Sequence, residues 1–288
     1  MTKLTLAGVA LLICGALVAA ACSPVRAFDT VMPKDSQSRK VASDIAYGDG
    51  PRRKLDIYAP VNAGRKTLPV IVFIYGGSWA NGTREGYHFA ARALAAQGFV
   101  TIVPDYRLVP EVHFPGFVQD CAEAVRWTRA HARQYGADPD RIVLVGHSAG
   151  AYNAAMLALD PQFLGPDRAA IKGFAGLAGP YDFLPFNGDV VKNTFGQWPR
   201  PEETQPIHYA AASAPPMLLL HGQDDDTVWP KNSINLDRKL RLLGASSELK
   251  VYPDLGHVGI VTALAKPFRG NAPVLDDVTR FARRVTGS

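Results

Sequence analysis

Ser148 lies between two glycines in the stretch VLVGHSAGA, residues 143–151. The stretch opens with an apolar run typical of a strand buried on both faces, and residues 149–159 are rich in helix formers. The sequence therefore predicts a sharp turn from strand to helix at the serine. Gly146 and Gly150 give the spacing G-x-S-x-G, where side chains would crowd the backbone. A serine held in this way is suited to nucleophilic attack.

A serine hydroxyl is a weak nucleophile at neutral pH, so it needs a nearby base and an acid that orients the base. Asp224, Asp225 and Asp226 follow the apolar run MLLLHG, and His257 follows the run LKVYP. Both groups lie just beyond a predicted parallel strand, at the sheet edge where open α/β sheets bind ligands. The order serine, aspartate, histidine thus predicts a catalytic triad.

Three further motifs accompany this order: YGGSW (75–79), DYRLVPEVHFP (105–115) and HGQDDDTV (221–228). With them, residues 45–286 resemble the α/β-hydrolase superfamily. The resemblance is to its carboxylesterase branch, related to hormone-sensitive lipase and including the BD-FAE-like esterases. It implies a mostly parallel central β-sheet with helices on both faces. It also implies a serine carboxylesterase that acts on a small-molecule ester and needs no cofactor.

The acid loop offers three adjacent carboxylates. Matching the family pattern H-G-x-x-D-x-x-V places the catalytic acid at Asp225, with Asp224 and Asp226 as rivals. Adjacent carboxylates repel one another, and the one buried against His257 gains most from a developing imidazolium. We therefore assign Asp225 as the acid and His257 as the base.

An oxyanion hole needs backbone N–H groups aimed at the developing charge. Ala149, the residue after the nucleophile, supplies one, and the resemblance implies the others at Gly77 and Ser78. Tyr75 stands where the family often has His, as in a Y-G-G-G form of the cholinesterase-type branch. Ser78 stands where a third Gly is common, so its backbone donor remains while its conformational freedom is reduced.

The other histidines have structural interpretations. His147 neighbours the nucleophile and His221 ends a predicted strand, so both are expected to be structural. The remaining ones show no metal-ligand spacing, and we predict no metal site; they are His88, His113, His131 and His208.

Asp105 and Arg107 are expected to form a structural ion pair or loop brace. Aromatic residues near the motifs allow two interpretations, since they either line an acyl or alcohol pocket or pack within loops; these are Trp79, Phe186, Phe195, Trp198 and Trp229.

Alternating strand and helix patterns indicate one α/β domain over residues 41–288. Strands are expected at 54–60 (as an edge strand), 68–75, 99–106, 141–146, 171–179, 215–222 and 247–253. Helices are expected near 85–97, 116–135, 149–159, 231–243 and 273–285. Residues 180–214 interrupt the alternation and are expected to form a small cap or lid.

The N-terminus resembles a bacterial lipoprotein signal. Residues 1–21 contain Lys3, an apolar stretch and small residues before Cys22, which predicts cleavage at that cysteine and lipidation of its side chain. Ordinary cleavage to a free periplasmic or secreted protein is the alternative. Residues 22–40 are expected to be a flexible tether to a membrane of the cell envelope, facing the periplasm.

Charge and cysteine content exclude some classes of protein. The formal charge is +5, and removal of Lys3 with the signal lowers it to +4, with no basic stripe that would favour nucleic acid. Cys121 is the lone cysteine after Cys22, so the domain has no disulfide framework.

Two other functions remain open at this point. The same triad serves amidases, such as arylformamidases, and peptidases. A hydrolase scaffold can also serve as a non-catalytic binding lipoprotein.

Overall fold

The computed structural model describes residues 24–64 and 67–288. The expected signal peptide and Cys22 lie outside the described residues. Within the described ranges, no helix has the length and apolar character needed to cross a membrane.

Eight strands form one sheet in the order β1-β2-β4-β3-β5-β6-β7-β8. The first three strands in that order pair antiparallel, and all later pairs are parallel. This confirms the predicted α/β class with a mostly parallel central sheet. The strands are β1 (Ser38–Ala46), β2 (Lys54–Pro60), β3 (Leu68–Ile74), β4 (Val100–Pro104), β5 (Ala137–His147), β6 (Ile171–Leu177), β7 (Met217–Gly222) and β8 (Ser247–Tyr252).

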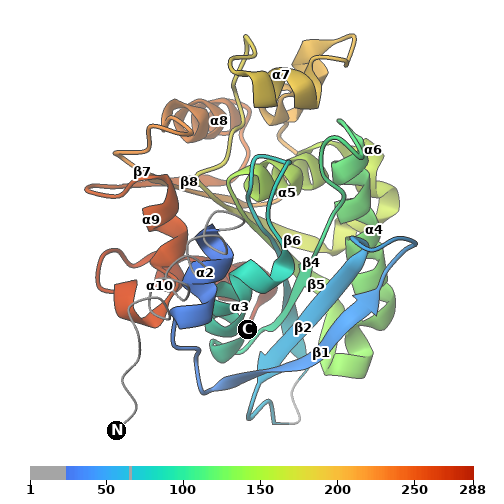
Figure 1. Ribbon diagram of the computed structural model, residues 1–288, viewed down its shortest axis with the longest axis vertical. Coiled ribbons are helices and arrows are strands. Elements are labelled where there is room, and N and C mark those ends of the chain that lie inside the picture. Colours follow the sequence, from blue (N-terminus) through green and yellow to red (C-terminus); the bar gives the residue numbers. More distant parts are fainter. Residues whose placement is uncertain (1–23, 65–66) are drawn as a thin grey trace, which may run out of the picture.

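Helices cover both faces of the sheet (Figure 1). A side chain at Gly173 of β6 would meet Phe281 of α10, whereas one at Gly146 of β5 would meet the start of α5. Gly146 pairs with Gly176, which lies three residues after Gly173 on β6. Because successive positions of a strand face opposite sides, Gly146 and Gly173 face opposite sides of the sheet. The α-helices are α2 (Pro24–Val31), α3 (His88–Ala96), α4 (Gly116–His131), α5 (Ala149–Leu159), α6 (Pro161–Leu164), α7 (Asp189–Phe195), α8 (Lys231–Leu242), α9 (His257–Thr262) and α10 (Val274–Thr286).

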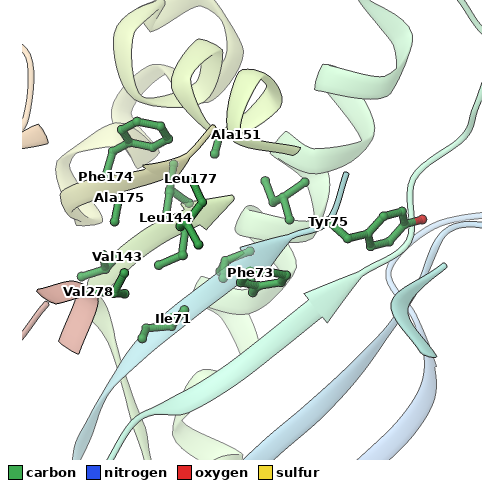
Figure 2. Packing of buried hydrophobic residues seen from close by; sticks show 14 of the residues in the cluster. Ile71, Phe73, Tyr75, Val143, Leu144, Ala151, Phe174, Ala175, Leu177 and Val278 are labelled. Atoms are coloured by element: carbon green, nitrogen blue, oxygen red, sulfur yellow. The ribbon is translucent and has the colours of Figure 1, made fainter. Parts of the chain in front are cut away.

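The central strands are apolar along their whole length because both faces are covered. In β5, every residue from Ile142 to Val145 is fully buried. Figure 2 shows Val143 lying beside Val278 of α10. This rigid core places the carboxyl ends of the parallel strands, and the loops that follow them, in fixed positions.

The predicted tether over residues 22–40 is wrong for the described part of that segment. Pro24–Val31 forms helix α2, and β1 already begins at Ser38. The carboxylate of Asp29 accepts the N–H of Phe89 at 2.6 Å, and Asp35 forms a two-pronged ion pair with Arg269. The segment is therefore docked on the domain, by partners distant in the sequence.

The prediction that residues 54–60, strand β2, form an edge strand is wrong. Strand β2 lies between β1 and β4, and its residues 55–59 are all buried. The strand missed in the sequence, β1, forms the edge instead. It alternates between half-buried and exposed positions and carries two register irregularities, so its sequence is polar.

Residues 180–214 contain the short helix α7 and two 3₁₀ turns, η4 (Pro201–Thr204) and η5 (Pro206–Tyr209). In Figure 1 the α7 segment stands at the top of the molecule, apart from the sheet. The other 3₁₀ turns are η1 (Arg84–Tyr87), η2 (Ala132–Tyr135), η3 (Gly165–Ala170) and η6 (Lys266–Phe268).

Candidate active site

The turn that carries Ser148 is strained and tightly packed. Ser148 has φ 54° and ψ −124°, a conformation that costs about 1–3 kcal/mol for a residue with a side chain. A Cβ at Gly146 would lie 2.4 Å from the carbonyl oxygen of Gly150, and one at Gly150 would lie 2.1 Å from that of Ile74. Both glycines are thus required for α5 to begin directly against β3 and β5.

The structure brings the three predicted catalytic side chains into one hydrogen-bonded chain. The Ser148 hydroxyl lies 2.8 Å from Nε2 of His257, and Nδ1 of His257 lies 2.8 Å from Oδ2 of Asp225. With Nδ1 protonated, Nε2 is free to accept the serine proton. Ser148 is 7 % exposed, so its hydroxyl is largely shielded from water.

Asp225 is the buried member of the three adjacent aspartates, whereas Asp224 and Asp226 are exposed. Its Oδ1 accepts the N–H groups of Thr227 at 3.0 Å and Val228 at 2.8 Å. Burial raises the pKa of Asp225, but hydrogen bonds from two histidines and the Val228 N–H outweigh burial and hold it well below its usual range. The carboxylate therefore stays ionised beside His257.

The sequence predicts a structural role for His221, and the structure adds a contact with the catalytic acid. His221 is fully buried, and its Nε2 lies 2.7 Å from the Val228 carbonyl oxygen and 3.2 Å from Oδ2 of Asp225. Its Nδ1 lies 2.7 Å from the Ser233 hydroxyl. The ring therefore ties the acid loop to the start of α8. Its place four residues before Asp225 was the available signal.

His147 also contacts the base. Its Nε2 lies 3.1 Å from the backbone carbonyl oxygen of His257, and its Nδ1 lies 3.3 Å from the Tyr87 hydroxyl. Burial, with a smaller effect from His257, lowers the pKa of His147 to about 3. The neutral ring therefore positions the backbone of His257, which agrees with a structural role.

The loop after β3 lies directly against the nucleophile. A Cβ at Gly76 would lie 2.8 Å from the Cβ of Ser148, so only glycine allows this approach. Gly77 has φ 136° and Ser78 has φ 53°, which shows how the loop accepts serine in place of a third glycine. Ser78 and Ala149 line the same cavity as Ser148. Gly77, which directly precedes Ser78, is not among the lining residues.

This loop is held by an ion pair different from the predicted one. Asp105 does not pair with Arg107: its carboxylate contacts Arg84 and accepts the Tyr75 hydroxyl at 2.8 Å. Arg107 instead pairs with Asp120, at 2.7 Å. The prediction of an Asp105–Arg107 pair is wrong, because each side chain has another partner of opposite charge, whereas the alternative of a loop brace agrees with the hydrogen bond from Tyr75 to Asp105.

A cavity of about 400 Å³ adjoins Ser148. Trp79 and Trp229 line it, together with apolar residues of the 180–191 segment. Phe195 is fully buried and packs on Phe186, and Trp198 lines a separate cavity of about 300 Å³. Two of the five aromatic residues considered from sequence therefore face the cavity beside the serine.

Residues 55–240 match the model of one protein family, BD-FAE. The chain belongs to the BD-FAE family. This confirms the resemblance inferred from the motifs, and the match includes Ser148 and Asp225 but ends before His257.

Relatives of this BD-FAE member are named as esterases. It is 31 % identical over 225 residues to esterase LipC of Mycobacterium tuberculosis, covering 70 % of this chain and 55 % of that protein. It is 30 % identical over 265 residues to the isoprenylcysteine alpha-carbonyl methylesterase ICME of Arabidopsis thaliana, covering 83 % and 61 %. The chain thus spans a little over half the length of these curated relatives.

Solved structures share the fold. A truncated carbohydrate esterase from gut microbiota superposes with a TM-score of 0.79 at 20 % identity, covering 89 % of this chain and all of that one. An inhibited esterase B from Lactobacillus rhamnosis gives 0.80 at 22 % identity, covering 96 % of each chain. At this identity the likeness establishes the α/β-hydrolase fold of the BD-FAE member.

Proposed function

We propose that this protein is a serine carboxylesterase that cleaves carboxylic esters through an acyl-enzyme. The observation that carries the proposal is the unbroken chain from the Ser148 hydroxyl through His257 to Asp225, beside a cavity of about 400 Å³. The esterase names of its relatives support the same reaction class. A protein that only binds a ligand has no need for a serine in strained backbone next to a base.

In the first half of the reaction, Ser148 Oγ attacks the ester carbonyl carbon while His257 Nε2 takes the hydroxyl proton. The electrons of the C=O bond move to its oxygen, and we assign its stabilisation to the Ala149 N–H and the N–H groups of the Gly77–Ser78 loop. When the intermediate collapses, the alcohol leaves with the proton from His257. Water then cleaves the acyl-enzyme by the same steps, and Asp225 stays ionised throughout.

The direct test is Ser148→Ala with a 4-nitrophenyl acetate assay. Loss of the nucleophile should lower kcat/KM by about 10³-fold or more, because the remaining groups cannot form the acyl-enzyme. A 4-nitrophenyl phosphonate should transfer its phosphonyl group to Ser148 of the wild-type chain, with loss of 4-nitrophenol, and leave the alanine variant unmodified. Activity of the variant within tenfold of wild type would disprove the proposal.

A substrate panel separates the ester reaction from the other reactions this triad performs. Aryl esters of increasing acyl length, an arylformamide and a peptide anilide would be compared by kcat/KM. We expect the esters to be hydrolysed fastest. Faster turnover of the formamide would show that the protein is an amidase, and faster turnover of the anilide would show that it is a peptidase.

We further propose that Cys22 is lipidated and holds the enzyme on a bacterial envelope membrane, facing the periplasm. The run of small residues that ends at Cys22 supports this location. A soluble periplasmic or secreted esterase is the alternative.

A further inference from the structure

Among the described residues that line the cavity beside Ser148, Lys231 is the one that carries a charge. The others are apolar or neutral polar side chains, contributed by the loop after β3, the turn at Ser148, the 180–191 segment, the acid loop and the start of α8. Lys231 is the first residue of α8 and is exposed. Any substrate that fills this cavity therefore meets one ammonium group.

Among the described residues, no carboxylate lies within ion-pair distance of this ammonium. Asp225, the buried carboxylate of the neighbouring loop, is engaged by His221 and His257. The Lys231 Nζ lies 5.2 Å from the centre of the Trp229 ring, which itself lines the cavity and is 59 % exposed. Such a contact orients a cation without cancelling its charge.

The position of Lys231 is unfavourable for the helix. The first turn of α8 has no acidic residue and starts with this lysine, although the helix dipole places partial positive charge at the same end. A cation here costs roughly 0.3–1 kcal/mol instead of stabilising the helix. A residue that violates a local rule at the edge of a substrate cavity is a candidate for function.

We propose that Lys231 makes the enzyme select esters that carry a carboxylate remote from the scissile bond. This inference rests on the proposed esterase function. The single ammonium matches a single negative charge, and Trp229 offers an apolar face to the carbon skeleton that joins the carboxylate to the ester. The substrate class is then half-esters of dicarboxylic acids, or hydroxybenzoates that are acylated on the hydroxyl group and keep a free carboxylate.

The test uses pairs of esters of matched size, in which one member carries a carboxylate and the other a neutral amide, with kcat/KM corrected for the rate of base-catalysed hydrolysis of each ester. On the acyl side, 4-nitrophenyl adipate half-ester is compared with its terminal amide; on the alcohol side, 4-acetoxybenzoate is compared with 4-acetoxybenzamide. We expect the carboxylate member of at least one pair to have the higher kcat/KM, by about fivefold or more at low ionic strength. The preference should shrink as salt screens the ammonium.

Three variants assign the preference to this residue. Lys231→Met should bring the two members of the preferred pair within twofold, whereas Lys231→Arg should keep the preference. Arg238→Met removes one positive charge from the same helix, outside this cavity, and should also keep it. Because of the helix dipole, Lys231→Met should be at least as stable as wild type in thermal unfolding.

Equal rates within both wild-type pairs would overturn the inference, as would a preference that survives Lys231→Met. If Arg238→Met lost the carboxylate preference to the same extent, the preference would come from the overall surface charge and not from Lys231. In each of these cases the neutral esters are still hydrolysed, so the esterase function stands. Failure of the function itself would appear separately, as no Ser148-dependent turnover of any ester.

Discussion

At the scale of single residues, burial separates three carboxylates that are identical in chemistry and adjacent in sequence. Asp225 is 3 % exposed and accepts two backbone N–H groups, while its neighbours are open to water. The motif match identified Asp225, but its interaction with His221 depends on how β7 and the acid loop pack together. A histidine that contacts an acid looks the same in sequence as one that fills a core.

Asp225→Asn is predicted to be far more damaging than the same change at Asp224 or Asp226. An amide at position 225 favours the wrong tautomer of His257, so we expect a loss in kcat of about 10³–10⁴-fold. The two exposed positions should stay within about threefold of wild type. Ester kinetics of the three variants decide the matter, and equal losses would show that the acid has been misassigned.

His147 is predicted to make the protein less stable as the pH falls. Its pKa drops from 6.5 to about 3 on folding. Between pH 6.5 and about pH 3, His147 is therefore protonated in the unfolded chain and neutral in the folded chain. Stability is therefore lost as the pH falls through this range, by up to a few kcal/mol.

His147→Gln removes this titration, so its urea midpoint should change less than that of wild type between pH 7 and pH 4.5. His88, whose pKa burial lowers to about 4, contributes with the same sign in both proteins and so cancels in the comparison. An identical pH dependence in the two proteins would show that His147 is not buried in its neutral form.

At the scale of elements, the periodic helices and the buried strands were predictable, and the polar edge was not. The seven strands expected from β2 to β8 all exist, and several of the central ones are continuous apolar runs, which are a strong signal. Helix α2 has eight residues, and Phe28 on it packs on Phe89 and Phe268. A helix held by partners so far along the chain leaves little trace in local sequence.

Gly150→Ala is predicted to disrupt the start of α5. The new methyl group would meet the backbone carbonyl oxygens of Ile74, the last residue of β3, and of Tyr75 at 2.1 and 2.3 Å, which cannot move without shifting the strand. We expect a loss of about 1–3 kcal/mol in stability, together with lower activity as Ser148 is displaced. Thermal unfolding and ester kinetics would measure both.

Gly270→Ala is the matched control for that substitution. Gly270 has open space around its Cβ position and no left-handed backbone angle, so the same change should leave stability and activity unaltered. If the two alanine variants behaved alike, the close approach of α5 to β3 would not be what requires the glycine.

At the scale of the whole molecule, the parallel sheet collects the loops after β3, β5, β7 and β8 at one edge. The nucleophile, acid and base come from positions 148, 225 and 257 and meet there because the carboxyl ends of parallel strands share that edge. This is why the order of motifs was enough to predict the triad. The cavity wall was less predictable, because the 180–214 segment has little regular structure.

The docking of α2 changes what lipidation at Cys22 would mean. Ser23 alone separates Cys22 from the first residue of α2, and Asp29 and Asp35 tie the following segment to the domain. A lipidated Cys22 would therefore hold the catalytic domain close to the bilayer, without an extended spacer. Several acyl chains on one residue anchor a protein firmly, at about 0.8 kcal/mol for each buried CH₂.

Cys22→Ala should accordingly move the enzyme out of the membrane fraction, or leave it unprocessed, while turnover of a soluble ester stays unchanged. Mass spectrometry of the wild-type N-terminus provides the second measurement, with an acylated cysteine as the expected first residue. An unmodified Cys22, or cleavage at a later residue such as Phe28, would rule out the anchor. Cleavage at Phe28 would also remove half of α2, so stability would fall together with the membrane association.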